Sequence, residues 1–372
     1  MLESDWIEST FRTLHALPEV AFQERKTAAF VAEALAGFGF EVQTGLAETG
    51  LVATLRGEQP GPVLGFRADM DALSHTVDGV SRVIHSCGHD ANMAMVLGLA
   101  RNVADRRLAH GTLKQIFQPA EEGLNGAREM IRQGVVDNLD LLFGIHLRPG
   151  QEASLHQASP ALYHGSSFHL EAVLTGVPAH AARPHMGVNA IDAAAAAVNA
   201  INAIRINPVV PHSAKVTRLL AGGSAINIIP DRAELSVDLR CQSNPLMREL
   251  IDKTTQAIRS AAATVGAEAT VEVRGGVVAA EYDEEMIALA REAIAAVLGE
   301  SGVLAPIVTP GGDDFHFYRQ HKPALKTGFI GLGCDLTPGL HHPDMSFDHR
   351  ALPDGVRILS YLTDKLLGVM PR

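Results

Sequence analysis

Hydrophobic and polar positions in the first 150 residues of the chain follow two patterns in turn. Segments 4–17, 24–38 and 91–104 have the apolar spacing of helices that bury one face. The segments between and after them are short and almost wholly apolar, which is typical of strands buried on both faces of a sheet. We predict these strands at residues 50–56, 62–68, 112–118 and 139–147. The alternation predicts an α/β fold with a mixed, largely parallel sheet flanked by helices.

A different pattern begins near residue 166 and ends near residue 277. It predicts the order strand, helix, strand, strand, helix, strand, which is the βαββαβ order of a ferredoxin-like domain. The segments are residues 167–175, 189–204, 213–220, 232–240, 245–265 and 269–274. The first pattern then returns in a helix, a strand and a helix at 284–298, 326–333 and 349–367. We therefore predict a catalytic domain of residues 1–165 and 278–372, interrupted by an inserted domain of residues 166–277.

Composition excludes several classes of function. The 372 residues carry a net charge of −11 and no basic stripe interleaved with aromatic residues, so nucleic acid is not an expected partner. The longest apolar runs are far shorter than the roughly 20 residues that cross a bilayer, which argues against a membrane protein. Three widely spaced cysteines do not make a disulfide framework, and the first residues do not form a secretory signal. We expect a cytoplasmic enzyme.

Candidate metal ligands occur just past the ends of predicted strands, where open α/β sheets place their sites. Cys87 and His89 are separated by one glycine, so a thiolate and an imidazole can converge on one ion. A buried, inert thiol is the alternative for Cys87. Asp69 and Asp71 follow the strand at 62–68, and by themselves they are typical of turns.

Adjacent carboxylates follow another strand at Glu121 and Glu122. Neighbouring side chains point in different directions, so one can bind a metal while the other stays free as a base. His146 ends an apolar strand, and a histidine in that place is more often part of the core. His341 precedes a second histidine and a proline in a loop rich in glycine, which core packing does not explain. The inserted domain adds His180, Asn227 and Arg240, each of which also suits a turn or a surface position.

These motifs together resemble the N-acyl-amino-acid amidohydrolases, a family that includes hippurate hydrolases and auxin-conjugate hydrolases. The resemblance spans nearly the whole chain. It is carried by the segments Arg67-Ala-Asp-Met-Asp-Ala-Leu73, His85-Ser-Cys-Gly-His-Asp90, Gln118-Pro-Ala-Glu-Glu-Gly123, Gly144-Ile-His146 and Leu340-His-His-Pro343.

The resemblance implies a role for each candidate. Two divalent metal ions per protomer, Zn²⁺ or Mn²⁺ with Ni²⁺ or Co²⁺ as further candidates, would be bound by Cys87, His89, Glu122, His146 and His341. Glu121 would be the general base, and His180 a catalytic residue that acts across a dimer interface in relatives. Asn227 and Arg240 would bind the substrate, a small N-acyl amino acid. The inserted domain would act as a lid and form a homodimer or a higher oligomer.

The sequence departs from the family in three places. Residues 74–84 are a short segment without the proline and glutamate that relatives carry there. Asn92 stands where a histidine is common, and Asp313 where a glutamate is common. These changes spare the expected ligands and bear on the choice of acyl group.

Other classes of function remain as alternatives. One is a metal-binding protein without hydrolytic activity. Another is an amidase that uses Cys87 as its nucleophile with His89 or His85 as the base. A third keeps the metal chemistry but cleaves dipeptides, as a dipeptidase or a carboxypeptidase-like enzyme does.

Overall fold

The computed structural model describes residues 3–104 and 106–371 and divides into two compact units. The first unit comprises Met1–Tyr163, Glu281–Val308 and Asp313–Arg372. The second comprises His164–Ala280 and Thr309–Gly312, so it interrupts the first along the chain. The chain passes between the units four times: within β10 (Leu162–His164), after Ala280, within β17 (Ile307–Thr309) and after Gly312.

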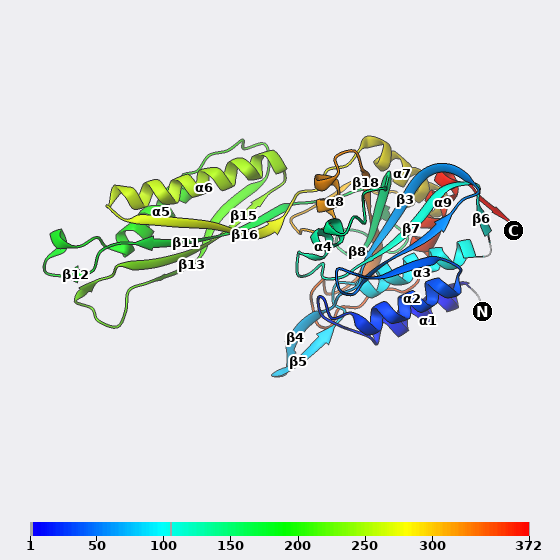
Figure 1. Cartoon of the computed structure of the whole chain (residues 1–372), viewed down its shortest axis with the longest axis horizontal. Helices are drawn as coiled ribbons and strands as arrows, with labels where there is room; N and C mark the ends of the chain where they lie inside the picture. The colour runs from blue at the N-terminus through cyan, green and yellow to red at the C-terminus, as the bar shows by residue number, and fades with distance from the viewer. Residues whose placement is uncertain (1–2, 105, 372) are drawn as a thin grey trace. The chain divides into compact units, whose positions relative to one another are not determined.

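A seven-stranded mixed sheet forms the centre of the first unit (Figure 1). The four central strands β7, β3, β8 and β18 are parallel to one another, whereas β1, β2 and β9 pair antiparallel with their neighbours. The parallel part of the predicted sheet is thus confined to its middle. In spatial order the strands are β1 (Glu41–Leu46), β2 (Gly50–Arg56), β7 (His110–Gln118), β3 (Gln59–Asp69), β8 (Leu141–Pro149), β18 (Lys326–Leu336) and β9 (Ala158–Ser159).

Helices cover this sheet. Helices α1, α3 and α9 pack against one another, and α3 and α9 also lie against β3. Helix α3 is buried around almost its whole circumference, as expected for a helix enclosed by other elements. The helices are α1 (Glu3–His15), α2 (Arg25–Gly37), α3 (His89–Ala104), α4 (Gly126–Arg132), α7 (Glu284–Leu298), α8 (His316–His321) and α9 (Ala351–Leu367).

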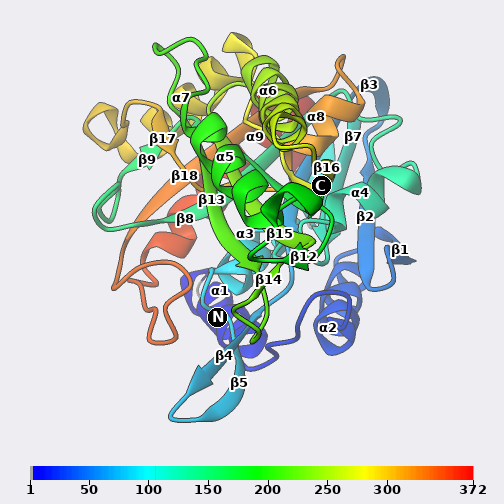
Figure 2. The same ribbon diagram turned by 90° about the vertical axis from the view of Figure 1, so that its left-hand side faces the viewer.

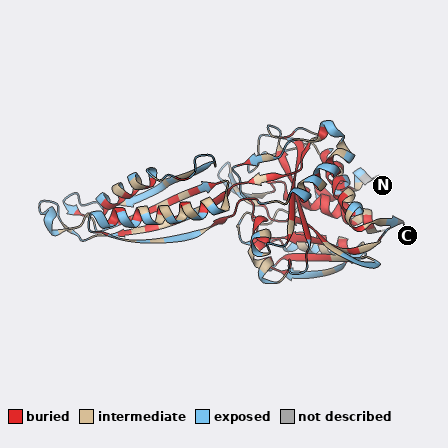
Figure 3. Ribbon diagram, turned by 90° about the horizontal axis from the view of Figure 1, so that it is seen from above, coloured by how far each residue is buried: buried red, intermediate tan, exposed pale blue. Residues whose placement is uncertain are grey.

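The core of the first unit lies between the central strands and these helices (Figure 3). Strand β8 is buried along eight of its nine residues, which explains why its sequence is almost continuously apolar. Removal of this apolar surface from water is the main force that fixes the strands in place. No helix in the described part of the chain is both long enough and apolar enough to span a membrane.

The second unit contains a four-stranded antiparallel sheet with the spatial order β13-β15-β11-β16. Its two long helices, α5 and α6, pack side by side on the strands (Figure 2). Asn189 and Ser243 cap the two helices by accepting hydrogen bonds from backbone N–H groups in the first turn. The elements follow one another as β11 (Ser166–Thr175), α5 (Ala190–Asn202), β13 (His212–Ala221), β15 (Arg232–Cys241), α6 (Asn244–Thr264) and β16 (Glu268–Val277).

Short elements complete both units. In the first unit, β4 (Leu73–Val77) and β5 (Val80–Ile84) form a hairpin in the segment that the sequence analysis identified only as short. A second ribbon joins β6 (Arg106–Leu108) to β19 (Val369–Pro371). In the second unit, β12 (Ala179–His180) pairs with β14 (Ile228–Ile229). Single 3₁₀ turns occupy Pro184–Met186 and Glu300–Gly302.

Candidate functional site

The candidate site of the first unit lies at one edge of its sheet. The central strands β3, β7, β8 and β18 are parallel, so their carboxyl ends meet at the same edge. The predicted ligands and Glu121 lie in the loops after β7 and β18, in the loop between β5 and α3, at the start of α3 and on β8. This is the edge at which open α/β sheets bind their ligands.

Gly88 brings Cys87 and His89 to the same point. Its φ of +90° lies in a region that L-residues other than glycine rarely adopt. A Cβ atom at this position would also come within 3.1 Å of the Leu147 side chain. The glycine therefore allows the chain to turn sharply into α3, with a buried thiol on one side of the turn and a buried imidazole on the other.

Five predicted ligands lie together in two groups of three donor atoms. The first group contains Cys87, His89 and His146, and the second contains Cys87, Glu122 and His341. Within each group the donor atoms lie within 4.8 Å of one another. The Cys87 Sγ atom is 3.6 Å from the His146 Nε2 atom, and the His341 Nε2 atom is 3.2 Å from a Glu122 carboxylate oxygen. Cys87 belongs to both groups.

The two buried histidines are oriented by backbone carbonyls. The Nδ1 atom of His89 lies 2.9 Å from the Asp71 carbonyl oxygen, and that of His146 lies 2.8 Å from the Leu147 carbonyl oxygen. A proton on Nδ1 leaves the Nε2 lone pair of each ring free for a metal. The Nε2 atom of His89 is buried and has no hydrogen-bond partner. Such an atom costs free energy unless a ligand satisfies it, so the donor set fits a metal ion.

The pKa values of these groups reflect burial and, at His89, nearby negative charge. Burial raises the pKa of the Cys87 thiol well above its usual range. Burial disfavours charging of His89, but the neighbouring Asp69 and Cys87 outweigh it and raise the pKa of that ring well above its usual range. Burial lowers the pKa of His146, which keeps this ring in the neutral form that binds metals. A divalent cation would offset the negative charge and make the Cys87 thiolate stable.

His341 comes from a loop with a constrained backbone. Its φ is +65°, and its N–H donates a 2.7 Å hydrogen bond to the Ser86 carbonyl, next to Cys87. About half of its side chain is exposed, whereas the other two predicted histidine ligands are buried. The hydrogen bond to Glu122 raises the pKa of His341.

Glu121 belongs to neither of these two groups, but it takes part in two others within the same distance limit, one with His89 and Glu122 and one with Asp313 and Asp314. One carboxylate oxygen is 4.0 Å from the His89 Nε2 atom, and the other is 3.4 Å from the Asp314 backbone N–H, which donates to it. The residue is buried, and burial raises its pKa well above the usual range for a glutamate, with further increases from Asp313 and Asp314. A raised pKa favours proton uptake by a carboxyl group, which suits a general base that later returns the proton.

The sequence analysis missed a buried charge network behind the site. The guanidinium of Arg67 is 1% exposed and donates to Asp69, to the Gln118 side chain at 2.9 Å and to Asp314 at 2.9 Å. Asp313 lies 3.3 Å from the same guanidinium. The one signal in the sequence was a charged residue inside an otherwise apolar strand, and that signal did not identify the partners.

Asp71 also does more than form a turn. Its two carboxylate oxygens accept hydrogen bonds from the backbone N–H groups of Glu121 and Glu122, at 3.1 and 3.0 Å. Its carboxylate also lies 3.3 Å from His89 Nδ1. This aspartate therefore orients both the predicted ligand His89 and the loop that carries the two glutamates.

The three predicted site residues of the second unit are all exposed. His180 lies on β12, where its Nδ1 atom accepts a hydrogen bond from the Ala182 N–H. The Asn227 carbonyl oxygen accepts a hydrogen bond from the N–H of Ala181, the residue after His180. Arg240, on β15, forms an ion pair with Asp238 at 3.0 Å. Their roles toward a substrate remain predictions.

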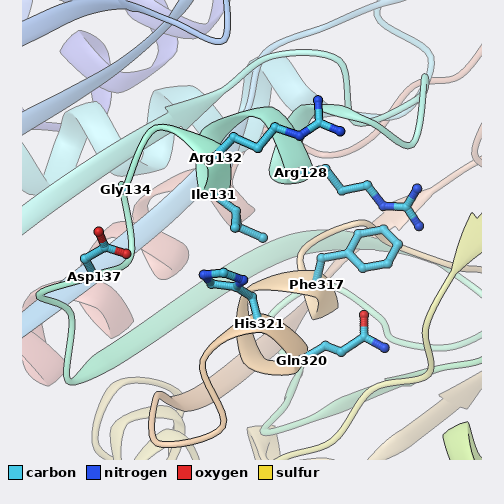
Figure 4. A pocket seen from close by; sticks show the side chains of 8 residues that line it. All are labelled: Arg128, Ile131, Arg132, Gly134, Asp137, Phe317, Gln320 and His321. Atoms are coloured by element: carbon cyan, nitrogen blue, oxygen red, sulfur yellow. The ribbon is translucent and has the colours of Figure 1, made fainter.

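A surface pocket of about 600 Å³ lies on the first unit between α4 and α8, and none of the predicted site residues lines it (Figure 4). The Arg128 guanidinium lies 4.1 Å from the centre of the Phe317 ring at this pocket. These two helices follow the loops of Glu121 and of Asp314, and the cation–π contact holds them together.

Comparison with known proteins identifies the family. The family described as peptidase family M20/M25/M40 matches residues 65–365. The chain belongs to this family. The resemblance to the N-acyl-amino-acid amidohydrolases is thereby confirmed, as is the mixed sheet flanked by helices.

Relatives within the M20/M25/M40 family span most of the chain. An indole-3-acetyl-aspartic acid hydrolase of Enterobacter agglomerans is 34% identical, over 84% of this chain and 76% of its own length. One of the polypeptides of the p-aminobenzoyl-glutamate hydrolase of Escherichia coli K12 is 33% identical, with the same two coverages. A Bacillus subtilis protein described as a dinuclear metal-binding peptidase of the M20 family is 27% identical. Its crystal structure matches with a TM-score of 0.83, over 98% of each chain.

Proposed function

We propose that this M20/M25/M40 family member is an amidohydrolase that uses two divalent metal ions to cleave N-acyl amino acids into a carboxylic acid and a free amino acid. The observation that carries the proposal is the convergence of two donor groups on Cys87, with the separate carboxylate of Glu121 beside them. The two relatives named above support the substrate class, because each is named for an amino acid that carries an aromatic acyl group.

Each donor group would hold one ion. Cys87, His89 and His146 would bind the first, and Cys87, Glu122 and His341 the second, with the thiolate shared. Thiolate, imidazole and carboxylate ligands together suit Zn²⁺, while Mn²⁺, Ni²⁺ and Co²⁺ remain candidates. When bound, two such ions polarise a carbonyl oxygen and make water more acidic.

Glu121 would move the proton in the reaction. Its carboxylate would accept a proton from the attacking water as the water oxygen forms a bond to the amide carbon. Glu121 would then deliver that proton to the amide nitrogen as the C–N bond breaks, so the amine leaves in a neutral form. The burial of this carboxyl group and its raised pKa suit a residue that holds the proton between the two steps.

The second unit would contribute in two ways. We propose that it is a ferredoxin-like domain, supported by its βαββαβ element order and its antiparallel strand order. We further propose that it forms a homodimer. Edge strand β13 supports this proposal because it exposes the apolar side chains of Leu219 and Leu220. Within this domain, His180 would assist catalysis and Asn227 and Arg240 would bind the substrate.

A hydrolysis screen on metal-loaded protein tests the activity. The panel contains acetyl, benzoyl, succinyl and indoleacetyl amino acids together with dipeptides, and release of the free amino acid is measured. We expect turnover of N-acyl amino acids that stops after chelation and returns when metal is added. Activity on dipeptides alone would favour the peptidase alternative. Activity that resists a chelator but is abolished by a thiol alkylator would favour Cys87 as a nucleophile.

Glu121→Gln tests the assignment of the base. The amide cannot take up the proton, so turnover should fall by at least about 100-fold while metal content stays the same. Glu129→Gln is the matched control, because Glu129 pairs with Arg132 on the exposed side of α4. Near-normal turnover in Glu121→Gln would show that another group is the base.

A further inference from the structure

The loop that carries Glu121 and Glu122 has an unfavourable backbone conformation. Ala120 and Leu124 have φ values of +53° and +55°, in the left-handed region that residues with a Cβ atom avoid. Ala120 is fully buried and immediately precedes the proposed general base. The structure around the loop must therefore impose this conformation.

Glu24 supplies one of the contacts that hold the loop. It lies just before α2, nearly 100 positions away along the chain, and its side chain is completely buried. One carboxylate oxygen accepts a 2.9 Å hydrogen bond from the Ala120 N–H. The other accepts a 2.6 Å hydrogen bond from the Thr49 hydroxyl, which fixes the carboxylate in place.

Two carboxylates share three successive backbone amides of this loop. Glu24 accepts a hydrogen bond from the N–H of Ala120, and Asp71 accepts hydrogen bonds from those of Glu121 and Glu122. Asp71 also contacts His89, so a change at Asp71 would disturb a metal ligand directly. Glu24 contacts the loop through Ala120 and offers a way to disturb the loop alone.

We propose that Glu24, oriented by Thr49, is a positioning residue for Glu121. It holds Ala120 in the left-handed conformation. Both glutamate carboxylates then lie 4.0 Å from the His89 Nε2 atom, while only Glu122 reaches His341 and only Glu121 accepts from the Asp314 N–H. Burial of a carboxylate is costly and raises the pKa of Glu24, and the two hydrogen bonds offset only part of that cost. The catalytic consequence rests on the function proposed above, whereas the effect on the loop does not.

Three variants test the proposal in the metal-loaded protein of residues 1–372. Glu24→Ala removes the acceptor, and we expect kcat to fall by about 10- to 100-fold with KM within about twofold. Glu24→Gln keeps an oxygen that can accept from the Ala120 N–H, so it should retain kcat within about threefold. Thr49→Val removes only the group that orients Glu24 and should give an intermediate loss. Glu33→Gln, on the exposed face of α2, is the control.

Two further measurements separate positioning from general damage. Metal content should stay at the wild-type value in Glu24→Ala, and a crystal structure of this variant should show Ala120 outside the left-handed region with Glu121 displaced. Adding Ala120→Gly to Glu24→Ala should restore part of kcat, because glycine adopts a positive φ without a steric penalty.

Several results would overturn the proposal. They are an unchanged kcat in Glu24→Ala, an equal loss in Glu24→Gln, or a crystal structure of the Ala variant in which the loop is unchanged. If Glu24→Ala does not fold, a wild-type kcat in Thr49→Val overturns it instead. A wild-type protein without turnover on any N-acyl amino acid would refute the proposed function, while the crystal structure of the variant would still decide the role of Glu24.

Discussion

Replacement of Arg67 by methionine is the most informative single perturbation of the fold around the site. Methionine keeps most of the length of the side chain and removes the cation. Three carboxylates, those of Asp69, Asp313 and Asp314, would then share a buried space without the positive charge that now lies 2.9 to 3.3 Å from two of them. Because the network is buried, water does not screen the repulsion between these carboxylates. We therefore expect the substitution to destabilise the whole domain.

The magnitude follows from the burial of the network. Removing one partner of a buried ion pair costs about 3–5 kcal/mol, because the other charge is left uncompensated. Whole proteins are stable by only about 5–15 kcal/mol, so Arg67→Met should lower the free energy of unfolding by a large fraction. Protonation of the freed carboxylates limits the loss, which keeps the estimate at about 3–5 kcal/mol for all three together.

The loss of unfolding free energy in Arg67→Met should increase with pH. The pKa of Asp314 is about 7 in the intact network, because burial raises it more than Arg67 lowers it. Removal of Arg67 raises this pKa further above its unfolded value of about 4. A carboxyl group with a raised folded pKa destabilises the fold increasingly as pH rises from the unfolded pKa through the folded one. The variant should therefore differ more from wild type at pH 8.5 than at pH 5.5.

Urea denaturation of the metal-free protein at these two pH values measures the effect. Metal is removed because bound ions would add their own stabilisation. Arg132→Met is the control, since Arg132 is an exposed residue paired with Glu129, and it should change the free energy of unfolding by less than about 0.5 kcal/mol. A loss below about 1 kcal/mol in Arg67→Met at pH 8.5, or an equal loss at both pH values, would refute the reasoning.

Three other predictions address the metal groups and the core. Cys87→Ala should lower the binding of both ions, because Cys87 belongs to both donor groups, whereas His341→Ala should impair only one. Metal titration followed by elemental analysis distinguishes these results, and equal losses in the two variants would contradict the assignment. Chelation should lower the melting temperature of the wild-type protein and have a smaller effect on Cys87→Ala, as calorimetry can show. Burial lowers the pKa of His316 to about 4, so only the unfolded state takes up this proton between pH 4 and about 6.5, and the free energy of unfolding should rise by up to about 3 kcal/mol over that interval. His316→Phe should remove this part of the pH dependence, and identical urea denaturation profiles for the two proteins across the interval would show that it does not exist.

The elements predicted most reliably from the sequence are those whose apolar residues show directly that they are buried. Strand β8 and helix α3 lie among the most buried elements of the first unit, and their apolar residues mark them clearly. Strand β1 was missed because five of its six residues are at least partly exposed, so its sequence carries little apolar signal. The β4–β5 hairpin was missed for the same reason.

The residues of the candidate site likewise fall into those that the sequence predicts and those that it does not. Cys87 and His89 could be proposed as ligands from the sequence because their types and spacing point to metal chemistry, and the structure brings them together in one donor group. The partners of Arg67 could not, since Asp314 is 247 positions away and only the folded chain brings it near. Glu24 was missed because a glutamate before a helix is ordinary in a sequence. Its importance comes from burial against a loop nearly 100 residues away.

Anomalous diffraction from a crystal of the protein loaded with Mn²⁺ tests the central claim most directly. The account predicts two anomalous peaks in the first unit, one bound by Cys87, His89 and His146, the other by Cys87, Glu122 and His341, with the Glu121 carboxylate beside them but coordinating neither. Peaks confined to exposed carboxylates elsewhere, or an empty cluster in crystals grown with excess metal, would contradict it.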